Sequence, residues 1–161
     1  MPILHLPPGP DRPTQGSQRH DPGRDEILER DGALLRVAVG VARSMTEELV
    51  RRGISFPAPI SGWGLLDTGA CRTCVDAKAA DKLGLPTAGW IDVTSATSPS
   101  SRQKIHPIRI RLEEIAFEIE IPHAIAAPLE GTGLVALIGR DVLRRCAVFY
   151  DGIPGRITLS C

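Results

Sequence analysis

The sequence contains few aromatic residues and no excess charge of either sign. Only 4% of its 161 residues are aromatic, so Ile, Leu, Val and Ala must supply most of the core. Nineteen Lys and Arg balance nineteen Asp and Glu. A chain without excess positive charge lacks the electrostatic attraction that drives general binding to nucleic acids and anionic membranes. We therefore expect neither nucleic acid nor a membrane as a partner.

Long hydrophobic runs and clustered metal ligands are also missing. No stretch approaches the roughly 18 apolar residues of a membrane span, and the N-terminus lacks the basic and apolar segments of a secretion signal. We therefore expect a cytoplasmic protein, in which thiols stay reduced. Cys71 and Cys74 have the C-x-x-C spacing of half a zinc site, but no second ligand pair accompanies them. We expect neither a metal nor a cofactor.

The length of the chain is that of one domain. Residues 1–31 hold six of the fourteen prolines and show no hydrophobic periodicity. This composition predicts a largely disordered tail over residues 1–31, followed by a folded domain over residues 32–161.

Within the domain, short segments of alternating apolar residues and many Pro and Gly residues indicate a mostly β protein. A capping box from Ser44 to Glu47 is predicted to open one of the helices. The predicted strands cover residues 33–41, 60–66, 91–94, 106–112, 117–121, 134–138, 147–150 and 156–161, and the predicted short helices cover 44–52, 76–83 and 141–145.

The segment Leu-Leu-Asp-Thr-Gly-Ala, residues 65–70, is the best candidate for chemistry. It places the carboxyl group of Asp67 at the end of a buried strand. Gly69 allows another backbone to approach closely, and the hydroxyl of Thr68 can bond to a neighbouring main chain. The alternative is that Asp67 simply begins an Asx turn after the strand.

A second segment about seventy residues downstream decides between these alternatives. Residues 136–143 read Ala-Leu-Ile-Gly-Arg-Asp-Val-Leu. Together with Asp-Thr-Gly-Ala-x-x-Thr, this segment resembles the retroviral-like aspartic proteases, the retropepsin family, and most closely the single-domain bacterial members. The resemblance covers roughly residues 33–161. It implies an all-β, retropepsin-like single-lobe fold, a closed β barrel with two or three short helices, completed as a homodimer.

The resemblance also implies roles for individual residues. Two chains would each contribute Asp67 to one active site, because the sequence contains a single Asp-Thr-Gly. The final strand, with Ile157 and Leu159, would form the dimer sheet. The remaining roles are catalytic support from Thr68 and Gly69, substrate binding by Ala70 and by the flap-tip residues Ala96, Thr97 and Ser98, and structural support from Gly139, Arg140 and Asp141.

The sequence departs from the retroviral pattern at two places. Cys71 stands where the retroviral enzymes have an acid that pairs with the arginine of the second segment, so Arg140 lacks that partner. The flap tip contains Ser-Pro-Ser-Ser, residues 98–101, in place of a glycine-rich turn.

The function expected from these features is that of a homodimeric aspartic endopeptidase that hydrolyses peptide bonds. Two neighbouring carboxyl groups resist ionising together, so such a pair carries one proton and supplies both a base and an acid. The alternative is a catalytically inactive dimeric module of the same fold that binds peptides. An actin-like ATPase, which also has an Asp-x-Gly loop, would need two large domains that 161 residues do not provide.

Overall fold

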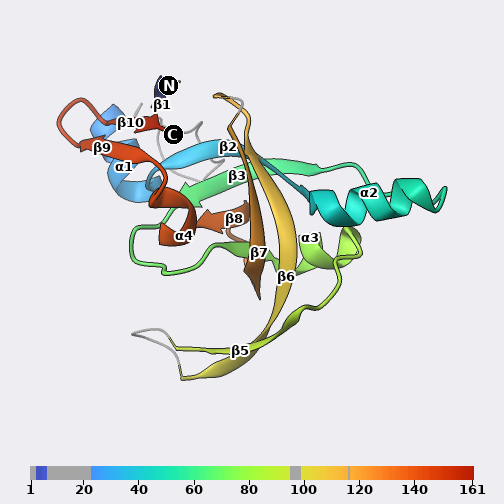
Figure 1. Ribbon diagram of the computed structural model, residues 1–161. Coiled ribbons are helices and arrows are strands. Elements are labelled where there is room, and N and C mark those ends of the chain that lie inside the picture. Colours follow the sequence, from blue (N-terminus) through green and yellow to red (C-terminus); the bar gives the residue numbers. More distant parts are fainter. Residues whose placement is uncertain (1–2, 7–22, 95–98, 116) are drawn as a thin grey trace.

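The computed structural model describes residues 3–6, 23–94, 99–115 and 117–161. Its centre is a closed barrel of six strands, which confirms the predicted all-β barrel (Figure 1). The strands follow one another around the barrel, and pairing of the last with the first closes it. In barrel order they are β2 (Leu34–Val41), β3 (Ile60–Leu66), β8 (Leu134–Ile138), β4 (Cys74–Asp76), β7 (Phe117–Ala127) and β6 (Ser101–Leu112).

Aliphatic side chains fill the barrel, as the shortage of aromatic residues requires. Val37 and Val39 of β2 are fully buried, and so are Ile108 and Ile110 of β6. Their period-two spacing places them on one face of each strand. The short strand β4, which the hydrophobic pattern did not reveal, inserts between β8 and β7.

Short helices lie at the ends of barrel strands. Helix α3 (Ala77–Lys82) begins as predicted, with the Asp76 carboxylate accepting a bond from the amide of Ala79 at 3.1 Å. Helix α4 (Arg140–Leu143) follows β8, and α2 (Arg43–Arg51) projects sideways from the barrel (Figure 1). No helix among the described residues is long and apolar enough to cross a membrane.

The predicted capping box at Ser44 is wrong. Helix α2 begins one residue earlier, after Ala42, and has no side-chain N-cap. The reason is a contact across the barrel surface, in which both carboxylate oxygens of Glu120 accept a bond from the amide of Arg43 at 3.1 Å. A partner on β7 thus satisfies the helix end that a local serine was expected to cap.

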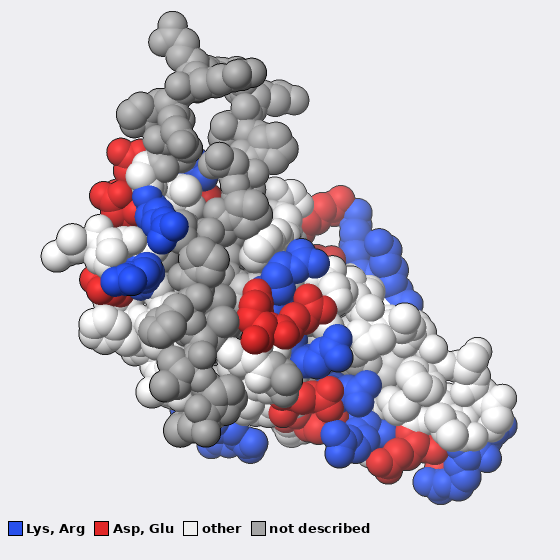
Figure 2. All heavy atoms as spheres, turned by 90° about the horizontal axis from the view of Figure 1, so that it is seen from above, with Lys and Arg blue, Asp and Glu red and all other residues white. Residues whose placement is uncertain are grey.

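Charges of both signs alternate over the surface shown in Figure 2. Cross-strand and helix-to-strand ion pairs also join charges of opposite sign in this protein. Glu118 lies 3.1 Å from the guanidinium of Arg43 and 3.7 Å from that of Arg109. The balanced composition therefore appears on this face as interleaved charge and not as one-sign patches.

A hairpin extends away from the barrel at one end (Figure 1). It is formed by β5 (Gly89–Val93) and the first residues of β6, which pair in antiparallel register from Gly89 with Ile105 to Val93 with Ser101. The hairpin stands at the place in the sequence where a flap was predicted, and its role as a flap stays a prediction. The tip positions Ala96, Thr97 and Ser98 lie outside the described residues.

The chain ends form a separate three-stranded sheet, in the order β1 (Ile3–Leu6), β10 (Arg156–Ser160), β9 (Ala147–Asp151). Helix α1 (Arg24–Asp31) lies beside this sheet. Leu28 of α1 is 4% exposed, and a Cβ on Gly155 would lie 2.2 Å from the backbone of Arg24.

These contacts correct the predicted disordered tail for two stretches. Residues 3–6 pair along β10, and residues 24–31 form a helix that buries Leu28. Composition missed them because one buried leucine and one strand edge leave no periodic signal. Residues 7–22 of the predicted tail lie outside the described residues.

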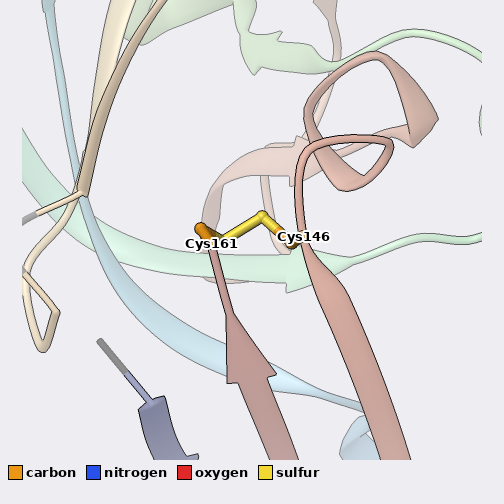
Figure 3. Close-up of a disulfide and its surroundings, with 2 residues drawn as sticks. All are labelled: Cys146 and Cys161. Carbon is orange, nitrogen blue, oxygen red and sulfur yellow. A yellow bond between two sulfur atoms is a disulfide. The ribbon is translucent and has the colours of Figure 1, made fainter. Parts of the chain in front are cut away.

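Cys146 and Cys161 form a disulfide that joins the segment after α4 to the C-terminus (Figure 3). The expectation that all four thiols are reduced is therefore wrong for this pair. The expectation followed from the expected cytoplasmic location. The spacing of fifteen residues between the two cysteines does not by itself predict a disulfide. Cys71 and Cys74 are free.

We expect removal of this disulfide to destabilise the domain. Closing a loop of this size lowers the entropy of the unfolded chain, which corresponds to about 3 kcal/mol. The double variant Cys146→Ser/Cys161→Ser should lose about that much free energy of unfolding in a denaturant titration, and the Cys71→Ser control should lose almost none. An unchanged double variant would show that the crosslink contributes nothing.

Candidate active site

The two sequence segments meet because the strands before them run side by side. β3 and β8 are parallel, with Leu66 opposite Ile138, so their carboxyl ends lie at the same edge. The amide of Asp67 donates to the carbonyl of Ile138 at 2.9 Å. The amide of Arg140 returns a bond to the carbonyl of Ala70, also at 2.9 Å. Residues 67–70 and 139–141 therefore form one structural unit.

The carboxyl group of Asp67 is fixed by its own loop. Its Oδ1 atom accepts bonds from the amides of Gly69 at 2.9 Å and Ala70 at 3.0 Å. This is the Asx turn of the alternative interpretation, and it gives the carboxylate one orientation. The Oδ2 atom accepts no bond from a described residue, and no buried polar side-chain atom among those residues is unpaired. Oδ2 therefore faces solvent, where it can contact water or a substrate.

The loop glycine also has little spare room. A Cβ on Gly69 would lie 3.2 Å from Oδ1 of Asp67, closer than ordinary van der Waals contact. Gly69 therefore lets the carboxylate approach its own loop. The side chain of Thr68 is exposed at the turn.

The buried residue Thr73 connects the two segments through hydrogen bonds. The amide of Thr73 donates to both carboxylate oxygens of Asp141 at 3.0 Å, and its hydroxyl donates to Oδ1 at 2.7 Å. The same hydroxyl accepts a bond from the amide of Gly139 at 3.1 Å. Thr73 is fully buried. Sequence reasoning included Thr73 in the motif but assigned it no role, and its spacing from Asp67 was the only available signal.

Gly139 is required where these segments cross. A Cβ at this position would lie 2.5 Å from the carbonyl carbon of Arg72, a backbone atom that cannot move aside easily. Gly139, Arg140 and Asp141, for which structural support was predicted, all contact residues 68–73.

Arg140 has a different partner from the one in the retroviral pattern. Its Nη1 atom donates to the carbonyl of Thr68 at 3.1 Å. Cys71, at the position of the missing acid, is exposed and free. A backbone carbonyl thus orients the guanidinium over the loop of Asp67, without an acid at position 71.

Cys74 lies near both carboxylates of the site. Burial, and then the negative charges of Asp67 and Asp141, raise the pKa of this thiol to about 11. A thiol with such a pKa is protonated at neutral pH and is a poor nucleophile. The C-x-x-C pair therefore consists of an exposed Cys71 and a half-buried, protonated Cys74.

The structure does not bring all of the predicted residues together. The flap-tip positions are not described, so among the predicted site residues only Asp67, Thr68, Gly69, Ala70 and the supporting segment can be related to one another. Ile157 and Leu159, predicted for the dimer sheet, are buried in this chain. Both edges of their strand are already paired, with β1 and β9.

Comparisons with known proteins add little to this geometry. No protein-family model matches the sequence, and neither does any curated protein. Among solved structures, the chain is similar to a foamy viral protease-reverse transcriptase in complex with an RNA/DNA hybrid, at 15% identity and a TM-score of 0.42. The match covers 70% of this chain and 12% of that one, so this chain spans only a small part of its length.

We expect the hydroxyl of Thr73 to be essential to this site. Thr73→Val keeps the shape but leaves the buried amide of Gly139 unpaired and removes a bond to a charged carboxylate, a loss of roughly 2–3 kcal/mol. Thr73→Ser keeps both bonds and should lose about 1 kcal/mol for one methyl group. Denaturant unfolding of the two variants measures this difference. Equal losses would mean that packing, and not hydrogen bonding, holds the segments together.

The two free thiols should differ in reactivity. At pH 8 only about one in a thousand Cys74 thiols is ionised at a pKa near 11, so iodoacetamide should modify the exposed Cys71 first. In Cys71→Ser the remaining labelling should be slow and should accelerate as the pH rises toward 11. Cys74→Ser serves as the control that labels at the wild-type rate. Mass spectrometry of the folded protein locates the label, and equal rates at Cys71 and Cys74 would contradict the burial argument.

Proposed function

We propose that the protein is a homodimeric aspartic endopeptidase, in which two copies of Asp67 form one active site. The observation that carries the proposal is the state of the Asp67 carboxyl group. Its Oδ1 is held by two loop amides, while Oδ2 faces solvent at the junction of the two segments. A carboxyl group with one oxygen fixed by hydrogen bonds and the other open to solvent is oriented to act on a bound water and substrate.

One chain supplies one carboxyl group of this kind. The nearby Asp141 is bound to Thr73 through both oxygens and supports the loop instead. Peptide hydrolysis by carboxyl groups needs a base and an acid at the same time. A second chain, related by a twofold axis, provides the missing group.

The proposed reaction begins with a water molecule between the two carboxyl groups. Ionised Asp67 of one chain removes a proton from this water, and the resulting hydroxyl attacks the peptide carbonyl carbon. Protonated Asp67 of the partner subunit gives its proton to the carbonyl oxygen, which forms a neutral tetrahedral diol. Proton transfer to the amide nitrogen then allows the C–N bond to break into a carboxylic acid and an amine.

Two parts of the fold support this proposal. The β5–β6 hairpin extends from the barrel, and its outer strand β5 has backbone groups along its edge with which an extended peptide could pair (Figure 1). The sheet of the chain ends has β9 as an outer strand, and its Val148, Phe149 and Tyr150 are 37%, 64% and 57% exposed. These apolar side chains form a surface that a second chain would cover.

Mixing wild type with Asp67→Asn tests catalysis and sharing of the site together. Pure Asp67→Asn should fold but should not cleave a proteome-derived peptide mixture, as followed by mass spectrometry. When equal amounts of the two chains are co-expressed, random pairing leaves about a quarter of the dimers with two wild-type chains. Activity per total protein should therefore fall to about a quarter of the wild-type value.

The matched control is Asp81→Asn, an exposed aspartate on α3, which should leave full activity in the same mixture. Activity of one half would mean that each chain works alone. Full activity of pure Asp67→Asn would remove Asp67 from the mechanism. A wild type that binds peptides but cleaves none would favour the inactive binding module.

A further inference from the structure

Beside the candidate catalytic loop lies an open cavity of about 880 Å³. This volume falls within the range of roughly 300–1,000 Å³ for ligand sites in proteins. Its lining includes Cys71 and Arg72, which directly follow the loop of Asp67, and Arg140, which bonds to the carbonyl of Thr68. The cavity and the candidate active site therefore share a wall.

Arginines dominate the charge of this cavity. Arg72, Arg140, Arg144 and Arg145 all line it. Among the residues that the structure describes, none of the four lies within 4.0 Å of a carboxylate oxygen. This contrasts with the interleaved charges on the face in Figure 2. A concave surface that carries one sign of charge attracts ions of the other sign.

The two carboxylates in the lining are already bonded within the protein. Asp141 accepts bonds from Thr73 and from the amide of Val142. Glu120 accepts the amide of Arg43 with both oxygens. Neither forms an ion pair with the arginines of the cavity, which retain an excess of positive charge.

The arrangement on α4 places like charges close together. Arg140 and Arg144 are four residues apart, on one side of the helical turn, where like charges repel. Both side chains are exposed, and they line the same cavity as Arg72. A bound anion would relieve this repulsion, and guanidinium groups hold carboxylates through paired hydrogen bonds.

We propose that this cavity binds Asp or Glu side chains of the peptide substrate, at positions away from the bond that is cleaved. This inference rests on the proposed peptidase function. A peptide is favoured over a free anion because Cys71 and Arg140 connect the cavity to the loop of Asp67. A peptide that is bound at Asp67 and extends past Ala70 toward Cys71 and Arg72 would come to the wall of this cavity.

The experiment compares cleavage profiles of wild type and Arg144→Glu/Arg145→Glu on the same proteome-derived peptide mixture. Both arginines are exposed, so the charge reversal should leave the fold intact. Wild type should enrich Asp and Glu at one or more positions outside the scissile pair. For a cleaved peptide and its Glu→Gln analogue, we expect about a tenfold preference in kcat/KM for the acid, smaller at high salt. The variant should lose or invert the preference.

The matched control is Arg51→Glu/Arg52→Glu, which reverses two adjacent exposed arginines on α2, far from α4 (Figure 1). It should keep the wild-type profile. Cleavage by wild type without any preference for acids would overturn the inference and leave the proposed function intact. A second outcome would also overturn the inference and leave the proposed function intact. In it, wild type shows no preference for acids, while inorganic phosphate raises the unfolding midpoint of wild type but not of Arg144→Glu/Arg145→Glu, so that the cavity holds a free anion.

A wild type that cleaves no peptide would remove the proposed function, and a binding measurement then decides the role of the cavity. Calorimetry compares acetylated tetraglutamate amide with acetylated tetraglutamine amide on the full chain. Tighter binding of the tetraglutamate to wild type, lost in Arg144→Glu/Arg145→Glu, would support recognition of acidic side chains. Equal binding of both peptides would overturn it.

Discussion

Three hydrogen bonds between Thr73 and Asp141 join segments that are 68 residues apart in the sequence. The geometry of the candidate site depends on them. They hold the start of α4 against the stretch that follows Ala70. The parallel pairing of β3 with β8 places Asp67 beside the start of the second segment. Both oxygens of Asp141 accept bonds from Thr73, whereas Oδ2 of Asp67 accepts none from a described residue.

The strands of the barrel were predictable from local sequence, whereas the closed barrel was implied by the family resemblance. Period-two runs of Val, Ile and Leu identified β2, β3 and β6, because one buried face leaves a clear alternation. The contact between the two motifs was implied by the family resemblance and not by the residues alone. β4 escaped detection because its three residues are too few for a pattern. β1 and α1 escaped because their stability comes from pairing with β10 and from the burial of Leu28, which are tertiary contacts.

The site was predictable in part for the same reason. Asp67 and Gly69 follow the end of β3 and Arg140 follows the end of β8, as the predicted strand bounds indicated, while their roles stay predictions. The partner of Arg140 was not predictable, because a backbone carbonyl has no sequence signature. Likewise, Glu120 binds the end of α2 where a cap by Ser44 was expected. Cys146 pairs with Cys161, fifteen residues away, and a local sequence pattern does not predict such a pairing.

The sheet of the chain ends constrains how two copies could share a site. Within this chain β10 is paired on both sides, and Ile157 and Leu159 belong to the core. A second chain that extends this sheet could therefore add to an outer strand such as β9, or it could displace β1 from β10. Addition leaves every existing hydrogen bond in place and covers Phe149 and Tyr150, whereas displacement must first break the four-residue pairing of β1. Phe149 and Tyr150 of β9 are exposed, so a second chain that adds at this strand would bury apolar surface without breaking a hydrogen bond of the sheet.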